Sequence, residues 1–192
     1  TGTGCCLVVR KRRDTYRGWK TPGDLGRVTA PLSPRRWESR GGFLFLMTER
    51  FKLVSAVHLF LVRDAQVLLL RRRNTGYEDG NYSVVAGHLN GGEKVKTAAI
   101  REAREEAGIE IAPQDVAVVG VMHRRSDDER IDFFLAASLW SGEIVNNEPG
   151  KCDDLSWFGL DELPENVIPY VRRALENFRH GRWFDSFGWP KE

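Results

Sequence analysis

The sequence predicts an α/β fold in which a β-sheet is covered by helices on both of its faces. Two observations carry this prediction: apolar runs of strand length recur between residues 53 and 158, and two segments show helical periodicity. Strands mixed with helices in this way favour a sheet packed between helices. The length of 192 residues suits one domain of ordinary size and is short for two.

The first two expected strands cover residues 54–62 and 66–70, and a tight turn at Arg63, Asp64 and Ala65 would make them a hairpin. A loop rich in turn-forming residues follows over residues 74–81. The other expected strands share apolar, β-branched and aromatic residues. They cover residues 82–86, 116–122, 131–139 and 155–158.

Two helices are expected. The first covers residues 94–107, is rich in Ala, Glu and Arg, and should end at Gly108. The second covers residues 165–180 and presents apolar side chains at helical spacing after Pro164. The aromatic residues of the tail after it, which we expect to cap the fold or an interface, are Trp183, Phe184, Phe187 and Trp189.

The charge of the chain is unevenly distributed. Residues 1–46 hold ten Lys and Arg against three Asp and Glu, whereas residues 47–192 hold 19 against 24. This division excludes a uniformly basic nucleic-acid-binding protein. We interpret residues 1–46 as a basic extension that is disordered or an artefact of translation, and residues 47–192 as the folded domain. An arm that contacts RNA or acidic lipid is the functional alternative.

The sequence also bears on localisation. No apolar run approaches the roughly 18 residues of a membrane-spanning helix, and the apolar residues near the start precede the basic ones, the wrong order for an export signal. The three cysteines are odd in number and lack metal-ligand spacing with the histidines. We therefore expect a cytoplasmic protein with no membrane partner.

Three glutamates gather on one face of the first helix. Glu102, Glu105 and Glu106 fall within about 100° of arc at helical geometry. Like charges at this spacing cost roughly 0.2–0.5 kcal/mol per pair, so helix stability does not explain them. Mg²⁺ takes oxygen ligands and would explain them. A solvated face whose glutamates pair with arginines is the alternative.

The residues around these glutamates form a longer motif. Gly87 is followed after five residues by Glu93, and after seven more by Arg-Glu-Ala-Arg-Glu-Glu-Ala-Gly-Ile over residues 101–109. This arrangement resembles the signature of the Nudix hydrolases at every fixed position. The resemblance implies an α/β/α sandwich with a mixed β-sheet, and Mg²⁺-dependent cleavage of a diphosphate attached to another moiety, with Mn²⁺ as a second possible metal.

The resemblance also implies roles for the motif residues. Glu102, Glu105 and Glu106 would be carboxylate ligands of the metal, with the carbonyl of Gly87 as a further ligand. Glu93 would pair with Arg101 to hold the loop against the helix. Glu105 or Glu106 could act as the general base, as could an acidic residue from a later loop, of which Asp127, Asp128, Glu129 and Glu148 are available.

Substrate selection lies outside the motif. Arg71, Arg72 and Arg73 end a strand that leads toward the site, and alternation along a strand prevents all three from pointing the same way. Tyr77 could stack on a base. The candidate substrate-binding residues are Arg71, Arg73, Tyr77, His88, Asp128 and Glu148.

The expected function is hydrolysis of a small-molecule nucleotide, with a nucleoside triphosphate or an oxidised nucleotide as first choice. Two alternatives stay open: a Nudix-fold binding or regulatory module without catalysis, and a pyrophosphohydrolase of RNA 5′ ends that uses the basic extension. A nucleic-acid partner is not the first expectation, and a homodimer is left open.

Overall fold

The computed structural model describes residues 50–190, so the basic extension expected over residues 1–46 lies outside the described residues. The strands of the described part are β1 (Val54–Arg63), β2 (Gln66–Arg72), β3 (Tyr82–Ser83), β4 (Val85–His88), β5 (Val116–Arg125), β6 (Glu129–Ala137), β7 (Cys152–Gly159) and β8 (Phe184–Phe187). The helices are α1 (Val95–Ala107), the short 3-10 helix η1 (Pro113–Asp115) and α2 (Pro169–Arg179).

The eight strands form one mixed sheet. Its main path runs β3-β2-β1-β6-β5-β8, with β4 paired to β1 and β7 paired to β2. The β1–β6 and β5–β8 pairs are parallel and the other strand pairs are antiparallel. The predicted mixed sheet is therefore confirmed.

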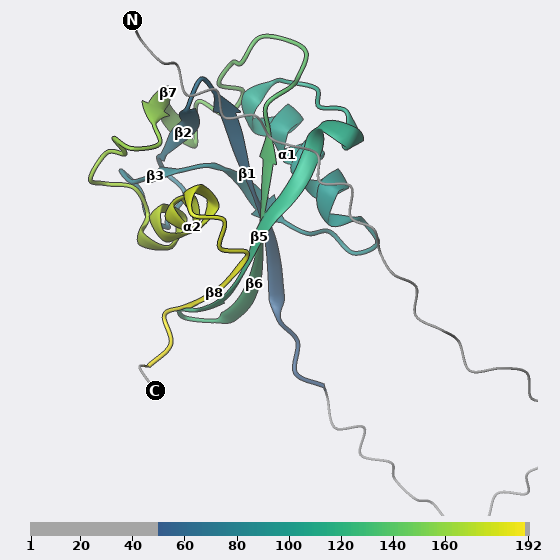
Figure 1. Cartoon of the computed structure of the whole chain (residues 1–192), viewed down its shortest axis with the longest axis vertical. Helices are drawn as coiled ribbons and strands as arrows, with labels where there is room; N and C mark the ends of the chain where they lie inside the picture. The colour runs from purple at the N-terminus through teal and green to yellow at the C-terminus, as the bar shows by residue number, and fades with distance from the viewer. Residues whose placement is uncertain (1–49, 191–192) are drawn as a thin grey trace, which may run out of the picture. The chain divides into compact units, whose positions relative to one another are not determined.

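The two helices cover opposite faces of this sheet (Figure 1). Alternation along β1 shows the two faces: Val57, Leu59 and Leu61 belong to the apolar cluster that contains the alanines of α1. Phe60 belongs to the second cluster, which contains the apolar residues of α2. Side chains of a strand point alternately to its two faces, so the α/β/α sandwich is confirmed.

The predicted hairpin is present, with Asp64 and Ala65 at positive φ (49° and 61°). Two consecutive positive-φ residues suit the right-handed twist of the strands they join. The two strands of the hairpin diverge close to the turn, because β1 and β2 pair only at the two positions next to it. Farther from the turn β1 pairs with β4 over residues 56–59. This switch brings the loop after β4 beside the start of β1.

Helix α1 agrees closely with the prediction. It ends where Gly108 adopts a left-handed conformation with φ of 69°, which glycine tolerates without steric cost. Ala98, Ala99, Ala103 and Ala107 are buried. Small side chains on this face let the helix lie close to the sheet, while its glutamates occupy a neighbouring arc.

Two sequence expectations about local structure were wrong. The strand expected over residues 82–86 is two strands, β3 and β4, which pair with β2 and β1 respectively. The helix expected from residue 165 begins only at Pro169. The first residues of the expected helix instead form hydrogen bonds with Tyr82. The Tyr82 N–H donates to the Asn166 carbonyl, and the Tyr82 carbonyl accepts from the Ile168 N–H. This pairing holds residues 166–168 extended.

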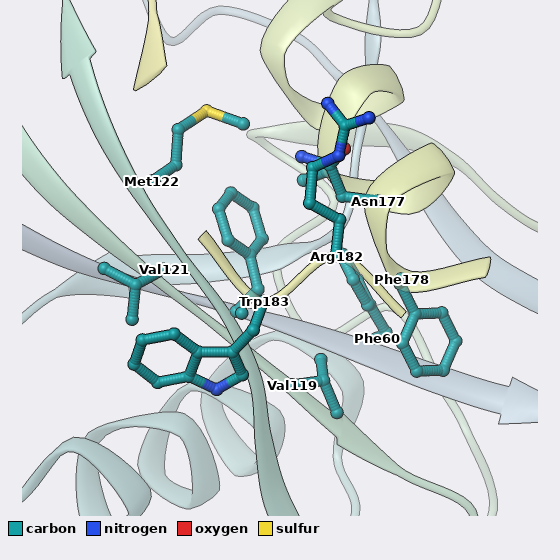
Figure 2. Close-up of a pocket in the computed structure, with 11 residues that line it drawn as sticks. Phe60, Val119, Val121, Met122, Asn177, Phe178, Arg182 and Trp183 are labelled. Carbon is teal, nitrogen blue, oxygen red and sulfur yellow. The ribbon is translucent and has the colours of Figure 1, made fainter. Parts of the chain in front are cut away.

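The aromatic tail includes a strand that the sequence analysis missed, because β8 lies parallel to β5. Trp183 and Phe184 stay more than half exposed. Figure 2 shows a small space beside this tail, lined by Phe60 of β1, Met122 of β5 and Phe178 of α2, among others. Its volume of about 10 Å³ holds about one water molecule. Among residues 50–190, no helix is long and apolar enough to cross a membrane.

Candidate functional site

A cavity of about 550 Å³ opens beside α1 and the glycine loop, by which we mean residues 87–94 with Gly87, Gly91 and Gly92. Pockets of a few hundred cubic ångströms hold nucleotide-sized ligands. Side chains from both helices and from most strands reach it. The polar and charged residues in its wall are His58, Arg72, Asn74, Thr75, Tyr77, His88, Glu102, Glu105, Glu106, Arg124, Arg130, Asn146, Glu148, Lys151 and Tyr170.

Arg101 holds the glycine loop against α1. Its guanidinium donates to Glu93 (Nη2 to Oε1, 3.0 Å) and to the His88 carbonyl (3.2 Å). Nη1 also donates to Glu102 (2.6 Å) and Glu105 (3.1 Å). The contact expected between Glu93 and Arg101 is thus present. Hydrogen bonds from Arg101 and from Asn90 N–H lower the pKa of Glu93, and hydrogen bonding to Glu93 raises the pKa of Arg101.

Gly87 and Glu102 are in close contact across the site. A Cβ placed on Gly87 would lie 1.8 Å from Oε1 of Glu102. A side chain at position 87 is therefore incompatible with the present position of this carboxylate. Burial raises the pKa of Glu102, and the hydrogen bond from Arg101 partly opposes this shift. The carboxylate is fixed from two sides, by glycine backbone and by the arginine.

Glu106 is the helix carboxylate whose pKa departs most from its ordinary value. Burial raises its pKa to about 8, while the Ala86 N–H, which donates to Oε2 at 3.2 Å, acts in the opposite direction. The charges of Glu102 and Glu148 raise the pKa further. Without a bound cation, this raised pKa favours the protonated form of the carboxyl group at neutral pH. Glu105 by contrast is about half exposed.

The donor chemistry of this wall fits a divalent cation. Three carboxylates reach one cavity, and Glu106 forms no ion pair with a cationic side chain of residues 50–190. Hard cations take oxygen ligands and displace protons from them. No three acidic, His or Cys side chains of residues 50–190 are yet grouped as a ready metal site. Arg101 donates hydrogen bonds to Glu102 and Glu105 in this region.

A second part of the wall comes from the loop over residues 73–81. Asp79 accepts hydrogen bonds from the Thr75 N–H and hydroxyl and from Gly76 N–H. This closes the loop on itself and presents Tyr77, whose exposed fraction is 44%. Arg72 donates to the Tyr77 carbonyl (2.8 Å) and lies 5.5 Å from the Tyr77 ring centroid.

The structure brings only some of the predicted substrate-binding residues to the cavity. Tyr77, His88 and Glu148 line it. Arg71 and Arg73 do not: Arg71 points to the other side of β2 and pairs with Asp153 at 2.7 Å. Alternation along β2 places Arg72 in the wall in their stead.

Asp128 is also outside the cavity wall. It accepts two hydrogen bonds of 2.6 Å from Arg130, and Arg130 is the residue that lines the cavity. The sequence predicts Asp128 as a residue of a later loop that could reach the site. In the structure Asp128 contacts Arg130 and is not itself part of the cavity wall.

Sequence reasoning missed a polar group in the same wall that is not part of the motif. Its members His58, Arg124 and Tyr170 come from β1, β5 and α2. A histidine inside an apolar strand pattern was the available signal, but the aspartate that it faces, Asp132, is 74 residues away in the sequence. No local pattern connects the two.

The fold and the site together define a class of protein: an α/β/α sandwich in which a glycine loop and a carboxylate-bearing helix form one wall of a nucleotide-sized cavity. A family model described as the NUDIX domain matches residues 52–180. This match spans most of the chain, and the chain belongs to the NUDIX family.

Curated relatives carry different names. The chain is 34% identical over 113 residues to an NAD-capped RNA hydrolase NudC of Pseudomonas aeruginosa, which covers 59% of this chain but only 38% of that protein. It is 27% identical to an ADP-ribose pyrophosphatase of Methanocaldococcus jannaschii (65% of this chain, 72% of that protein). It is 28% identical to a putative 8-oxo-dGTP diphosphatase of Bacillus subtilis (64% and 77%).

A solved structure is consistent with the same family. A MutT NUDIX hydrolase from Burkholderia pseudomallei is 28% identical and superposes with a TM-score of 0.61. The match covers 66% of this chain and 98% of that one. The shared region is thus a whole domain in that protein, whereas the chain spans about two fifths of the length of the NudC relative.

Proposed function

We propose that this protein is a Mg²⁺-dependent hydrolase of a diphosphate bond in a nucleoside diphosphate that carries another group. Nucleoside triphosphates and oxidised nucleotides are the first substrates to test, and Mn²⁺ is the second metal. One observation carries the proposal: the signature carboxylates open into the same cavity as the cationic side chains of Arg72 and Lys151. Carboxylates suit a divalent cation and cationic side chains suit phosphate.

A bound divalent cation would offset diphosphate charge and lower the pKa of a coordinated water. Glu102, Glu105 and Glu106 would hold it, with the Gly87 carbonyl as a further oxygen. Arg101 orients two of these carboxylates through its hydrogen bonds. The candidates for the general base are three carboxylates in the cavity wall, those of Glu105, Glu106 and Glu148. Arg72 and Lys151 would orient the phosphates.

The decisive experiment is a substrate panel with the purified full chain and Mg²⁺. The panel contains nucleoside triphosphates, oxidised nucleotides, ADP-ribose, dinucleoside polyphosphates and capped RNA, and release of phosphate or pyrophosphate is measured. We expect at least one substrate to be hydrolysed and chelation of the metal to stop the reaction. Glu105→Gln and Glu106→Gln should each lower kcat about 10²-fold or more.

Glu110→Gln is the matched control, since Glu110 is exposed, pairs with Arg104 and lies outside the cavity wall. A panel with no turnover would contradict the proposal. So would Gln variants at positions 105 and 106 that are as fast as an active parent, whereas the absence of turnover on every substrate would favour the non-catalytic binding module.

Capped or triphosphorylated RNA ends are the second candidate, favoured by the name of the NudC relatives. This candidate predicts that deletion of residues 1–46 removes activity on RNA ends and leaves activity on free nucleotides. Equal loss on both substrate types, or no loss on either, would speak against it.

A further inference from the structure

A second polar cluster lies in the cavity wall outside the signature helix. His58 of β1 and Arg124 of β5 line the cavity, and Asp132 of β6 lies between their strands. All three are almost completely buried, with exposed fractions of 3% for His58 and Arg124 and 0% for Asp132. Buried ionisable side chains carry a desolvation cost, so their presence needs an explanation.

The hydrogen bonds of this cluster are incomplete. Arg124 Nε donates to Asp132 Oδ2 at 2.6 Å. His58 Nε2 lies 3.4 Å from Asp132 Oδ1, within ion-pair distance, but neither atom makes a hydrogen bond within residues 50–190, and His58 Nδ1 makes none there either. An unsatisfied buried polar group costs about 1–3 kcal/mol. Three such atoms at one point of a cavity wall indicate that a ligand completes the set.

Packing alone does not account for the histidine. The imidazole stacks on Phe134 with ring centroids 5.0 Å apart and meets the edge of Tyr170 at 5.5 Å. A phenylalanine would make the same contacts without leaving polar atoms unpaired. Even when one ring nitrogen bonds to Asp132, the other lacks a partner, whichever tautomer is present. His58 is therefore one partner short beside the cavity.

The charges around the cluster favour a neutral ligand group over a phosphate. Arg124 is matched by Asp132, and Arg130 is matched by Asp128. Neither of these two arginines is unmatched, and the free Oδ1 of Asp132 would repel an anion. The guanidinium of Arg124 lies 4.0 Å from the Tyr170 ring centroid and makes that region planar and polarisable. A flat, neutral group with hydrogen-bond donors and acceptors suits it.

We propose that His58, Arg124 and Tyr170 form the subsite for the nucleobase of the substrate, with Asp132 as the positioning residue behind them. This inference rests on the proposed function, because it presumes a nucleotide in the cavity. His58 and Arg124 contact the polar edge of the base. Asp132 fixes the orientation of Arg124 and faces His58. The subsite thus selects among bases, while the glutamates of α1 serve the diphosphate.

The test measures binding without catalysis. The parent protein and variants are titrated, in the absence of metal, with adenosine, guanosine, cytidine and uridine, and with ribose and inorganic phosphate as probes that lack a base. His58→Phe keeps the aromatic stack on Phe134 and removes both ring nitrogens. His123→Phe is the matched control on β5, since His123 lies outside the cavity wall.

We expect at least one nucleoside to bind the parent and to shift NMR signals of residues 58 and 170. Its affinity should fall at least 10-fold in His58→Phe and stay within 2-fold in His123→Phe. Loss of one hydrogen bond to a buried group corresponds to about 10-fold or more. The thermal midpoint of His58→Phe should equal or exceed that of the parent, which a merely structural role for the imidazole would not allow.

For any substrate found, the ratio of kcat/KM between nucleotides with different bases should also shrink in His58→Phe. Asp132→Glu, which keeps the charge but moves it, should shrink the same ratio. The proposal is overturned if no nucleoside binds better than ribose, if His58→Phe binds like the parent, or if inorganic phosphate loses as much affinity as the nucleoside. Nucleoside binding without any hydrolysis would overturn the proposed function and leave the subsite standing.

Discussion

Gly87 and Glu102 approach each other so closely that a single methyl group between them is excluded. The added Cβ of Gly87→Ala would lie 1.8 Å from Oε1 and 2.6 Å from Oε2 of Glu102. The obstacle is the end of a flexible side chain, so the fold can yield by moving the carboxylate. Gly87→Ala should therefore impair catalysis and leave the stability of the fold nearly unchanged.

Gly87→Ala should lower kcat/KM about 10²-fold, since a displacement of about 1 Å at a reacting centre has that effect. Its thermal midpoint should stay close to that of the parent. Gly91→Ala is the control in the same loop, where a Cβ meets nothing within 4 Å. Steady-state kinetics and thermal unfolding of both variants check the prediction, and a Gly87→Ala enzyme with parental kinetics would refute it.

Gly188 shows the opposite case. A Cβ there would lie 2.0 Å from the carbonyl oxygen of Arg125, and the residue has a φ of 79°. Backbone cannot move aside as a carboxylate can, and a left-handed φ is itself unfavourable for alanine. Gly188→Ala should lower the free energy of unfolding by about 1–3 kcal/mol, by loosening the end of β8. Chemical denaturation measures this, with Gly150→Ala, where the Cβ is free, as the comparison.

Arg101 donates hydrogen bonds to acceptors on both the glycine loop and α1. This geometry requires a planar guanidinium group with several N–H donors. A lysine at this position has one nitrogen and cannot reach Glu93, Glu102 and Glu105 together. Arg101→Lys should lower activity about 10–100-fold, the range for residues that orient metal ligands. The Mg²⁺ concentration for half-maximal rate should rise. Arg104→Lys, at an exposed pair with Glu110, should leave both quantities within 2-fold.

The sequence predicted the parts of this molecule whose signals are local. Gly108 ends α1 as expected because the last turn needs a left-handed residue. The start of α2 could not be predicted, because residues 166–168 are held extended by Tyr82, more than 80 residues earlier. The site divides in the same way: the glutamates of α1 follow from helical spacing, whereas the Arg124–Asp132 pair depends on how β5 meets β6.

Asp132 should make the stability of the protein depend on pH in the acid range. Burial alone would raise its pKa, but the nearby His58 and the hydrogen bond and charge of Arg124 outweigh burial and lower the pKa to about 2. In the unfolded chain an aspartate has a pKa near 3.9. A depressed folded-state pKa stabilises the protein above the unfolded value, and this contribution is lost as the pH falls from about 4 toward 2. Its size is about 2.5 kcal/mol.

Asp132→Asn isolates this contribution, because asparagine keeps the shape and does not titrate. At pH 6 the variant should be less stable than the parent by about 3–5 kcal/mol, since Arg124 loses its buried partner. As the pH falls from 4 toward 2, first the unfolded and then the folded parent takes up the proton, and the gap between the two unfolding free energies should shrink by about 2.5 kcal/mol. Asp127→Asn, at an exposed aspartate, should match the parent throughout. The measurement is the free energy of unfolding in urea at several pH values. A difference between parent and variant that stays constant below pH 4 would show that Asp132 is not the group that titrates.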